Sequence, residues 1–71
     1  MVRGKVKSYD PDREIGCVIS ETGLNLFFHS YDVIWRNGSR PRLQENQSVD
    51  FDVISDRRGR RAVNIEPLEE R

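Results

Sequence analysis

The sequence predicts an all-β protein, a small barrel of five short strands. Five runs rich in β-branched and aromatic residues are each bounded by turn residues, and apolar and polar side chains alternate within them. Such alternation is typical of strands that bury one face. A long polar segment, residues 30–48, separates the first three runs from the last two. This spacing favours an antiparallel barrel of the OB type over a small SH3-like barrel, which is the alternative.

The first three expected strands cover residues 2–9, 15–19 and 26–29. The first ends at Asp10-Pro11-Asp12, where Asp caps a turn and Pro presets φ. Glu21-Thr22-Gly23 closes the second as a short hairpin turn. The connection that follows the third strand is mostly loop, with a short helical turn expected at residues 31–35.

The last two expected strands cover residues 49–54 and 62–65, and Pro67 stops the second. The arginine-rich connection between them is expected to form a hairpin in which Gly59 supplies a positive φ. Residues 1–66 form the expected domain, and residues 67–71 are expected to be a flexible C-terminal tail. The expected core is apolar and consists of Val6, Val18, Leu26, Phe28, Val33, Val49, Phe51, Val53, Val63 and Ile65.

Composition limits the classes of function. The chain has 71 residues, with 12 basic and 12 acidic side chains, so any nucleic-acid binding would depend on local clusters of cations. One cysteine and one histidine cannot form an intramolecular disulfide or complete a four-ligand zinc site. The sequence has no phosphate-binding glycine-rich loop and no dedicated nucleophile–base pair, so we expect no enzyme, metal or cofactor. It also has no long apolar run or signal peptide, which indicates a cytoplasmic protein.

The third expected strand gives the first sign of a binding surface. Its side chains alternate, so Leu26 and Phe28 should face the core while Phe27 and His29 share the outer face. Exposed rings beside cations are what proteins use to hold unpaired bases. The alternative is that Phe27 packs under the long loop and His29 is an ordinary surface residue.

Cations cluster near this expected face. Lys7 and Arg13 would flank the rings, and strict alternation places Lys5, Lys7 and Tyr9 together unless a bulge intervenes. The alternative for Tyr9 is structural packing at the edge of the barrel. The densest basic cluster is Arg57, Arg58, Arg60 and Arg61 in the last hairpin. Arginine binds phosphate and stacks on bases, although a charged hairpin tip can also be simply solvated. Trp35 is either a relocated stacking ring or an anchor of the long loop.

Five segments resemble motifs of the bacterial cold-shock domain family. In chain order they are GKVKSYD (residues 4–10), REIGCVI (13–19), LFFH (26–29), LQENQSVDF (43–51) and RGRRAVNI (58–65). They are similar to the family patterns G-x-V-K-W-F-N, K-G-F-G-F-I, V-F-V-H, L-x-E-G-Q-x-V-x-F and G-x-x-A-x-N-V. The resemblance covers nearly the whole chain in order, and it implies a five-stranded antiparallel OB-fold barrel of cold-shock domain type.

The resemblance also implies sequence-tolerant binding of single-stranded RNA or DNA and chaperone-like melting of weak RNA structure. The candidate nucleic-acid-binding residues are Lys7, Tyr9, Arg13, Ile15, Cys17, Phe27, His29, Tyr31, Trp35, Arg57, Arg58, Arg60 and Arg61. Several aromatic residues of the family patterns are replaced in this sequence. Ser8 occupies the position of a Trp, and Ile15 and Cys17 occupy the positions of two Phe residues. Ser30 occupies the position of a further aromatic residue, and Tyr31 follows it immediately. Because stacking contributes about 1–3 kcal/mol per base, we expect a weakened or altered affinity.

The same replacements give an alternative function. An exposed apolar stripe often marks a protein contact. The barrel would then have lost nucleic-acid binding and would form a homodimer, or meet a protein partner, through the stripe Ser8, Ile15, Cys17 and Ile19. An exposed strand edge offers a further route to self-association.

Overall fold

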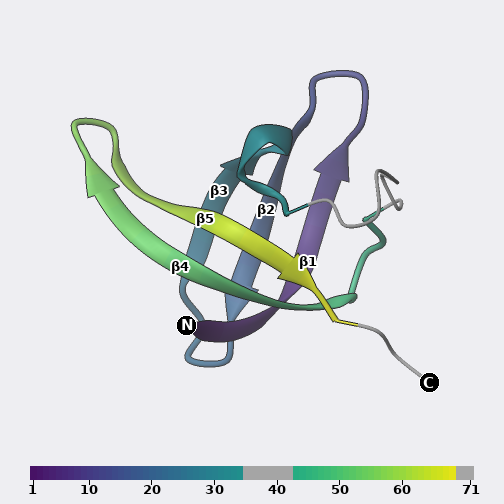
Figure 1. Ribbon diagram of the computed structural model, residues 1–71, viewed down its shortest axis with the longest axis horizontal. Coiled ribbons are helices and arrows are strands. Elements are labelled where there is room, and N and C mark those ends of the chain that lie inside the picture. The colour runs from purple at the N-terminus through teal and green to yellow at the C-terminus, as the bar shows by residue number, and fades with distance from the viewer. Residues whose placement is uncertain (35–42, 69–71) are drawn as a thin grey trace.

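The protein folds into a closed five-stranded barrel (Figure 1). The structure is a computed structural model that describes residues 1–34 and 43–68. Its elements are β1 (Val2–Asp10), β2 (Ile15–Ser20), β3 (Asn25–His29), a 3-10 turn η1 (Ser30–Asp32), β4 (Ser48–Asp56) and β5 (Gly59–Pro67). The strands are ordered β1-β2-β3-β5-β4 around the barrel. The predicted all-β barrel of five strands is therefore confirmed.

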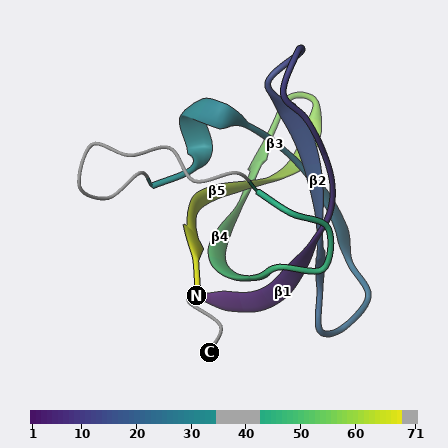
Figure 2. The ribbon, with the colours of Figure 1, turned by 90° about the vertical axis from the view of Figure 1, so that its right-hand side faces the viewer.

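One contact in the barrel is parallel, which the prediction of antiparallel strands did not include. Neighbouring strands pair antiparallel except β3 and β5, where Phe27 lies beside Arg61 in a parallel bridge. Directions cannot alternate all the way around a closed ring with an odd number of strands, so one neighbouring pair must be parallel. Figure 2 shows the strands curving around a common interior.

A β-bulge in β1 changes which side chains point outward. Val6 pairs with Val18 and Ser8 pairs with Cys17, so Lys7 is an extra residue in β1. Strict alternation would place Tyr9 on the outer face with Lys5 and Lys7. The bulge instead turns Tyr9 toward the core, where it is half-buried. Tyr9 therefore does not share the outer face with Lys5 and Lys7, and packing of its ring, the alternative for this residue, is what the structure has.

The Tyr9 ring packs on a core ring. It stacks on Phe28 with ring centroids 5.8 Å apart and planes 6° apart. Gly16, which pairs with Tyr9, makes room for this stack: a Cβ there would lie 2.5 Å from the Phe28 ring. The absence of a side chain at Gly16 therefore allows both rings to fill this end of the barrel.

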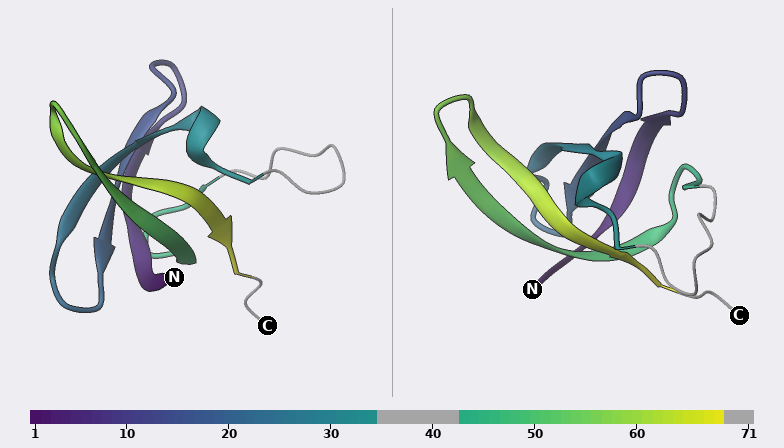
Figure 3. Two further views of the ribbon diagram at one scale, coloured as in Figure 1. Left: turned by 60° about the vertical axis from the view of Figure 1, so that its left-hand side comes forward. Right: turned by 45° about the horizontal axis from the view of Figure 1, so that its top comes forward.

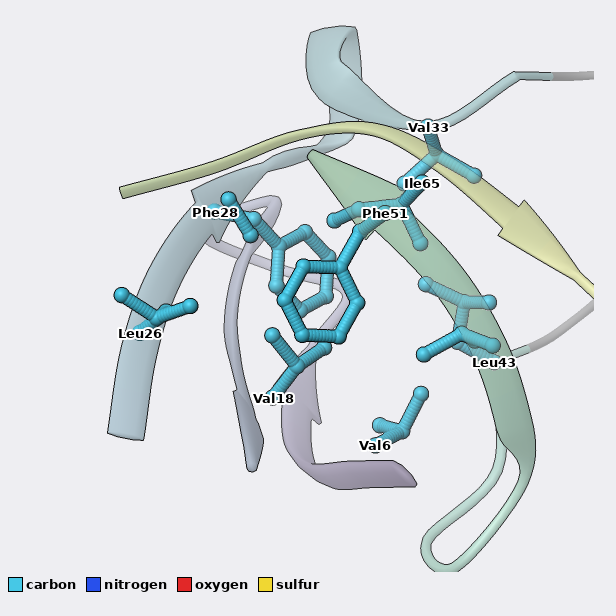
Figure 4. Packing of buried hydrophobic residues seen from close by; sticks show 10 residues of the cluster. Val6, Val18, Leu26, Phe28, Val33, Leu43, Phe51 and Ile65 are labelled. Atoms are coloured by element: carbon cyan, nitrogen blue, oxygen red, sulfur yellow. The ribbon is translucent and has the colours of Figure 1, made fainter. Parts of the chain in front are cut away.

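The core is a single apolar cluster inside the barrel (Figure 4). Its members are Val6, Val18, Leu26, Phe28, Val33, Leu43, Val49, Phe51, Ala62 and Ile65. Eight of the ten predicted core residues are among them. Val53 is half-buried and packs against the cluster, whereas Leu43 and Ala62 are buried residues that the prediction lacked.

Val63 is the one predicted core residue outside the cluster and its packed neighbours. The β4–β5 register shifts between Asp50, which pairs with Glu66, and Asp52, which pairs with Val63. Asn64 lies in this bulge with a φ of 52°. The extra residue means that Ala62 and Ile65, rather than Val63 and Ile65, point inward.

Three segments lie toward the same end of the barrel: η1, the β4–β5 hairpin and the β1–β2 turn (Figures 1 and 3). The helical turn expected at residues 31–35 begins one residue earlier and ends at Asp32. Val33 is already extended and bridges Ile65, so the chain leaves the turn along β5. At the other end of β5, Leu68 N–H donates to the Ser48 carbonyl at 2.9 Å. The boundary expected between domain and tail at residue 66 stays a prediction.

Candidate nucleic-acid interface

The outer face of β3 carries an exposed ring. Phe27 is 72% exposed, whereas Leu26 and Phe28 are 1% and 3% exposed, so the predicted alternation is confirmed. Phe27 lies directly opposite Cys17 of β2, which lies opposite Ser8 of β1. Across this row, the side chains are therefore the ring of Phe27 on β3, the thiol of Cys17 on β2 and the hydroxyl of Ser8 on β1.

His29 and Tyr31 form a second aromatic feature beside Phe27. Their ring centroids are 4.4 Å apart and their planes 21° apart. His29 Nδ1 accepts a hydrogen bond from Tyr31 N–H at 3.2 Å, and His29 N–H donates to Asp32 Oδ2 at 2.9 Å. An accepting Nδ1 places the proton of the neutral imidazole on Nε2. Tyr31 is 87% exposed, so the side of its ring turned away from His29 is open to a base.

The β4–β5 hairpin presents arginines opposite these rings. Asp56 Oδ1 accepts from Arg58 N–H at 2.8 Å, and Gly59 takes a φ of 111°, as a tight turn requires. Arg57 and Arg58 form the turn, and Arg60 follows on β5. All three are exposed, and no residue in the described part of the chain pairs with their guanidinium groups.

Arg61 differs from the other hairpin arginines because two carboxylates hold it. Its Nη1 lies 3.5 Å from Asp32 Oδ2 and its Nε lies 3.6 Å from Asp56 Oδ2. Each contact is a partly exposed ion pair that contributes little to folding stability. Together they connect η1 to the hairpin and reduce the positive charge that Arg61 can offer to a ligand.

A groove open to solvent, of about 800 Å³, lies between these two walls. It is lined by Ile15, Phe27, Phe28, His29, Tyr31, Asp32, Asp56, Arg58, Gly59, Arg60 and Arg61. One wall is aromatic, and the other carries two unpaired guanidinium groups. An arrangement of this kind can stack bases and neutralise phosphates on neighbouring surfaces.

A family comparison agrees with this fold. The model of the "'Cold-shock' DNA-binding domain" matches residues 2–68. The chain belongs to the cold-shock domain family. It is 38% identical over 68 residues to the major cold shock protein of Streptococcus pyogenes serotype M1, covering 96% of this chain and 98% of the relative.

Two further relatives are similar along nearly their whole length. A cold shock-like protein of Aquifex aeolicus is 39% identical over 69 residues, which is 96% of each chain. The cold shock-like protein CspC of Bacillus cereus is 31% identical over 67 residues, which is 94% of this chain and all of the relative. The predicted family is therefore confirmed.

Of the remaining candidates of this cold-shock domain, Ile15 also lines the groove, whereas Lys7, Arg13 and Cys17 do not. Ile15 is 42% exposed opposite His29, and Cys17 is half-buried. Lys7 Nζ donates to Asn25 Oδ1 at 3.3 Å, and Arg13 Nε lies 3.9 Å from Asp10 Oδ2.

Three observations complete the placement of the predicted residues. Tyr9 packs on Phe28 and is absent from the lining of the groove. Trp35 lies outside the described residues. The stripe Ser8, Ile15, Cys17 and Ile19 is continuous on the outer face, because Lys5 pairs with Ile19 and Ser8 with Cys17. A homodimer or protein partner at this stripe stays a prediction.

Asp32 and Asp56 are site residues that sequence reasoning missed. Asp32 follows His29 by three residues, the spacing of a capping box, and the cap on η1 has this form. Asp56 stands at the start of Asp56-Arg57-Arg58-Gly59, where a carboxylate commonly caps a turn. Both signals were present in the sequence. Their shared contact with Arg61 depends on the barrel bringing β5 next to η1.

A pair of opposite charges lies away from the groove, on β1 and β4. Arg3 Nε donates to Asp50 Oδ1 at 3.0 Å across β1 and β4. This hydrogen bond raises the pKa of Arg3 and lowers the pKa of Asp50. Within the described residues, no group of three or more His, Cys, Asp or Glu side chains is arranged to hold a metal ion. The same residues include no helix long and apolar enough to cross a membrane.

Proposed function

We propose that this cold-shock domain binds single-stranded RNA or DNA with little base preference. The observation that carries the proposal is the open groove with exposed rings on one wall and unpaired arginines on the other. Every base has a flat face, so stacking on Phe27 and Tyr31 tolerates any sequence. Contacts from the hairpin arginines to phosphate are equally blind to sequence.

The mechanism is passive. Bases stack only when they are unpaired, so binding stabilises the open strand at the expense of weak hairpins, as in an RNA chaperone. Nucleotide hydrolysis is not required, and the activity is that of a binding protein in the cytoplasm rather than an enzyme. The Nε2–H of His29 adds one hydrogen-bond donor beside the stacked bases.

The affinity should be lower than that of a cold-shock domain with a complete set of rings. Ser8, Ile15 and Cys17 stand on the outer face without an aromatic ring. Aliphatic and small side chains offer a base less contact area. With stacking at about 1–3 kcal/mol per base, the loss moves the dissociation constant toward the micromolar range or weaker.

A titration with short oligo-U and oligo-T, followed by backbone amide shifts, tests the proposal. Shifts should cluster on Phe27, His29, Tyr31 and the hairpin, and they should weaken from low to near-physiological salt because phosphate contacts release counterions. A duplex of the same length is the control, since its bases are not available for stacking. Absence of shifts at low salt and high micromolar ligand would contradict the proposal, and a dimer in sedimentation would then favour the protein-contact alternative.

A single substitution gives the first quantitative prediction. Phe27→Ala removes one stacking ring and should weaken oligo-U binding about tenfold, within the 1–3 kcal/mol range for one base. Ile54→Ala is the matched control, because Ile54 is an exposed apolar residue of β4 that does not line the groove. Equal effects from the two substitutions would mean that Phe27 does not contact the bases.

A further inference from the structure

We infer that the bound strand occupies the groove between η1 and the β4–β5 hairpin rather than crossing β1 and β2. The inference rests on the proposed function and narrows it to a short site with about two stacked bases. It follows from three independent features of the outer face: where the rings are, which of their sides are free, and which cations are unpaired.

Among the described residues of the outer face, the exposed rings lie at the groove. The part of the face on β1 and β2, here called the β1–β2 half, consists of Ser8, Ile15, Cys17 and Ile19 and contains no aromatic side chain; Ile15, at its border, also lines the groove. Phe27 is the most exposed ring of the sheet, and Tyr31 extends beyond it on η1. A base above Cys17 would have no ring beneath it, whereas a base above Phe27 or Tyr31 would.

The stack of His29 on Tyr31 limits the number of bases. Each of these two rings uses one side on the other, at 4.4 Å between centroids. Because His29 is half-buried whereas Tyr31 and Phe27 are largely exposed, the outer side of Tyr31 and the exposed side of Phe27 are the two most open platforms. A site with two platforms holds about two bases. The affinity for longer strands should therefore rise only because such strands can bind in more registers.

Two cations without a partner among the described residues, Arg58 and Arg60, lie beside these platforms, whereas Lys5, which also has none there, lies farther away on β1 opposite Ile19. Arg58 and Arg60 line the groove and have no partner among the described residues. In the β1–β2 half, Arg13 lies near Asp10 and Lys7 is bonded to Asn25. The β1–β2 turn also carries Asp12 and Glu14, so its net charge is unfavourable for a phosphate. The negatively charged phosphates of the bound strand are therefore attracted to the hairpin rather than to the β1–β2 turn.

Paired charge removal on the two sides tests the inference. Arg58→Ser with Arg60→Ser should weaken oligo-U binding about tenfold at low salt and reduce the salt slope by about 1.4, the value for two phosphates of a single strand. Lys7→Ser with Arg13→Ser removes the same charge and should weaken binding about threefold or less. Amide spectra of both variants check that the barrel is intact, since all four side chains are exposed.

Strand length gives a second, independent readout. The affinity for oligo-U of two to eight nucleotides should rise steeply to about three nucleotides and then only in proportion to the number of registers. A continued steep rise to six nucleotides, or a larger loss from Lys7 and Arg13 than from Arg58 and Arg60, overturns the inference and leaves the proposed function standing. If the unmodified protein binds no oligonucleotide of any length, both are overturned.

Discussion

The groove and the β1–β2 half lie on one continuous outer face, yet they differ in what they offer a ligand. Both are built on the same register, in which Ile15 pairs with His29 and Cys17 with Phe27. Beneath both, the inward residues Val18, Leu26 and Phe28 are fully packed. Only the outward side chains differ, with rings and free arginines on one side and small or aliphatic groups on the other. This difference indicates that the inner face specifies the fold, so side chains of the outer face that could bind a ligand can be replaced locally without loss of the barrel.

Restoring rings in the β1–β2 half should have the largest effect. Ile15→Phe with Cys17→Phe places two rings directly beside His29 and Phe27 in the existing register. Two added platforms at about 1–3 kcal/mol per base should raise oligo-U affinity about a hundredfold and lengthen the site by about two nucleotides. The measurement is the affinity profile against strand length.

A ring far from this face is the control for that gain. Thr22 is exposed in the β2–β3 turn, at the opposite end of the barrel from the groove (Figure 1). Thr22→Phe adds the same apolar area without a neighbouring platform, so oligo-U affinity should not change. An equal gain from Thr22→Phe would mean that any exposed ring binds bases, and the contrast between the two sides would lose its meaning.

The inner face should respond to a single methyl group. Gly16→Ala brings a Cβ to about 2.5 Å from the Phe28 ring, which is already stacked on Tyr9, so one of the rings must move. Overpacking of this kind costs typically 1–3 kcal/mol, and we expect about 2 kcal/mol of lost unfolding free energy in urea. Phe28→Leu in the same chain should recover part of the loss. If the losses of unfolding free energy from the two substitutions simply add, the strain caused by Gly16→Ala does not involve the Phe28 ring.

Alternation predicted one strand well and two strands incompletely, for a physical reason. The β2–β3 register has no bulge, so the outward Phe27 and inward Leu26 follow from spacing alone. In β1 and β5, extra residues at Lys7 and Asn64 shift the alternation, so strict alternation gives the wrong face for Tyr9 and Val63. A bulge depends on the partner strand as much as on its own residues, so a single strand's pattern does not reveal it.

The candidate site was predictable as a set of residues but not as a shape. Tyr31 and the hairpin arginines were identified from the family pattern and local charge. That Arg61 is neutralised while Arg58 and Arg60 are not depends on a contact with Asp32, 29 residues earlier in the chain. Pairing between such distant residues is a consequence of the parallel β3–β5 closure, which no local signal contains.

A smaller effect is expected at Glu14 in the β1–β2 turn, which occupies the position of the first glycine in the family pattern K-G-F-G-F-I. Glu14 has a φ of 58°, a left-handed conformation that disfavours a side chain. Glu14→Gly should therefore raise the unfolding free energy by about 0.5–1 kcal/mol, partly offset by greater freedom of the unfolded chain. Glu14→Gln keeps the strain while removing the charge, so it should not stabilise the barrel in the same melt. Equal stabilisation by both would assign the effect to charge.

The smallest effect concerns the arginine that the carboxylates hold. Asp56→Asn keeps the oxygen that accepts from Arg58 N–H but removes the charge 3.6 Å from Arg61, so Arg61 becomes freer to meet a phosphate. Oligo-U affinity should rise about twofold and the salt slope should steepen by up to about 0.7. Asp10→Asn removes the same charge beside Arg13 in the β1–β2 half, and there the salt slope should stay constant. If both substitutions steepen the slope equally, the strand responds to net charge alone, and the two sides of the face are electrostatically equivalent despite their different rings.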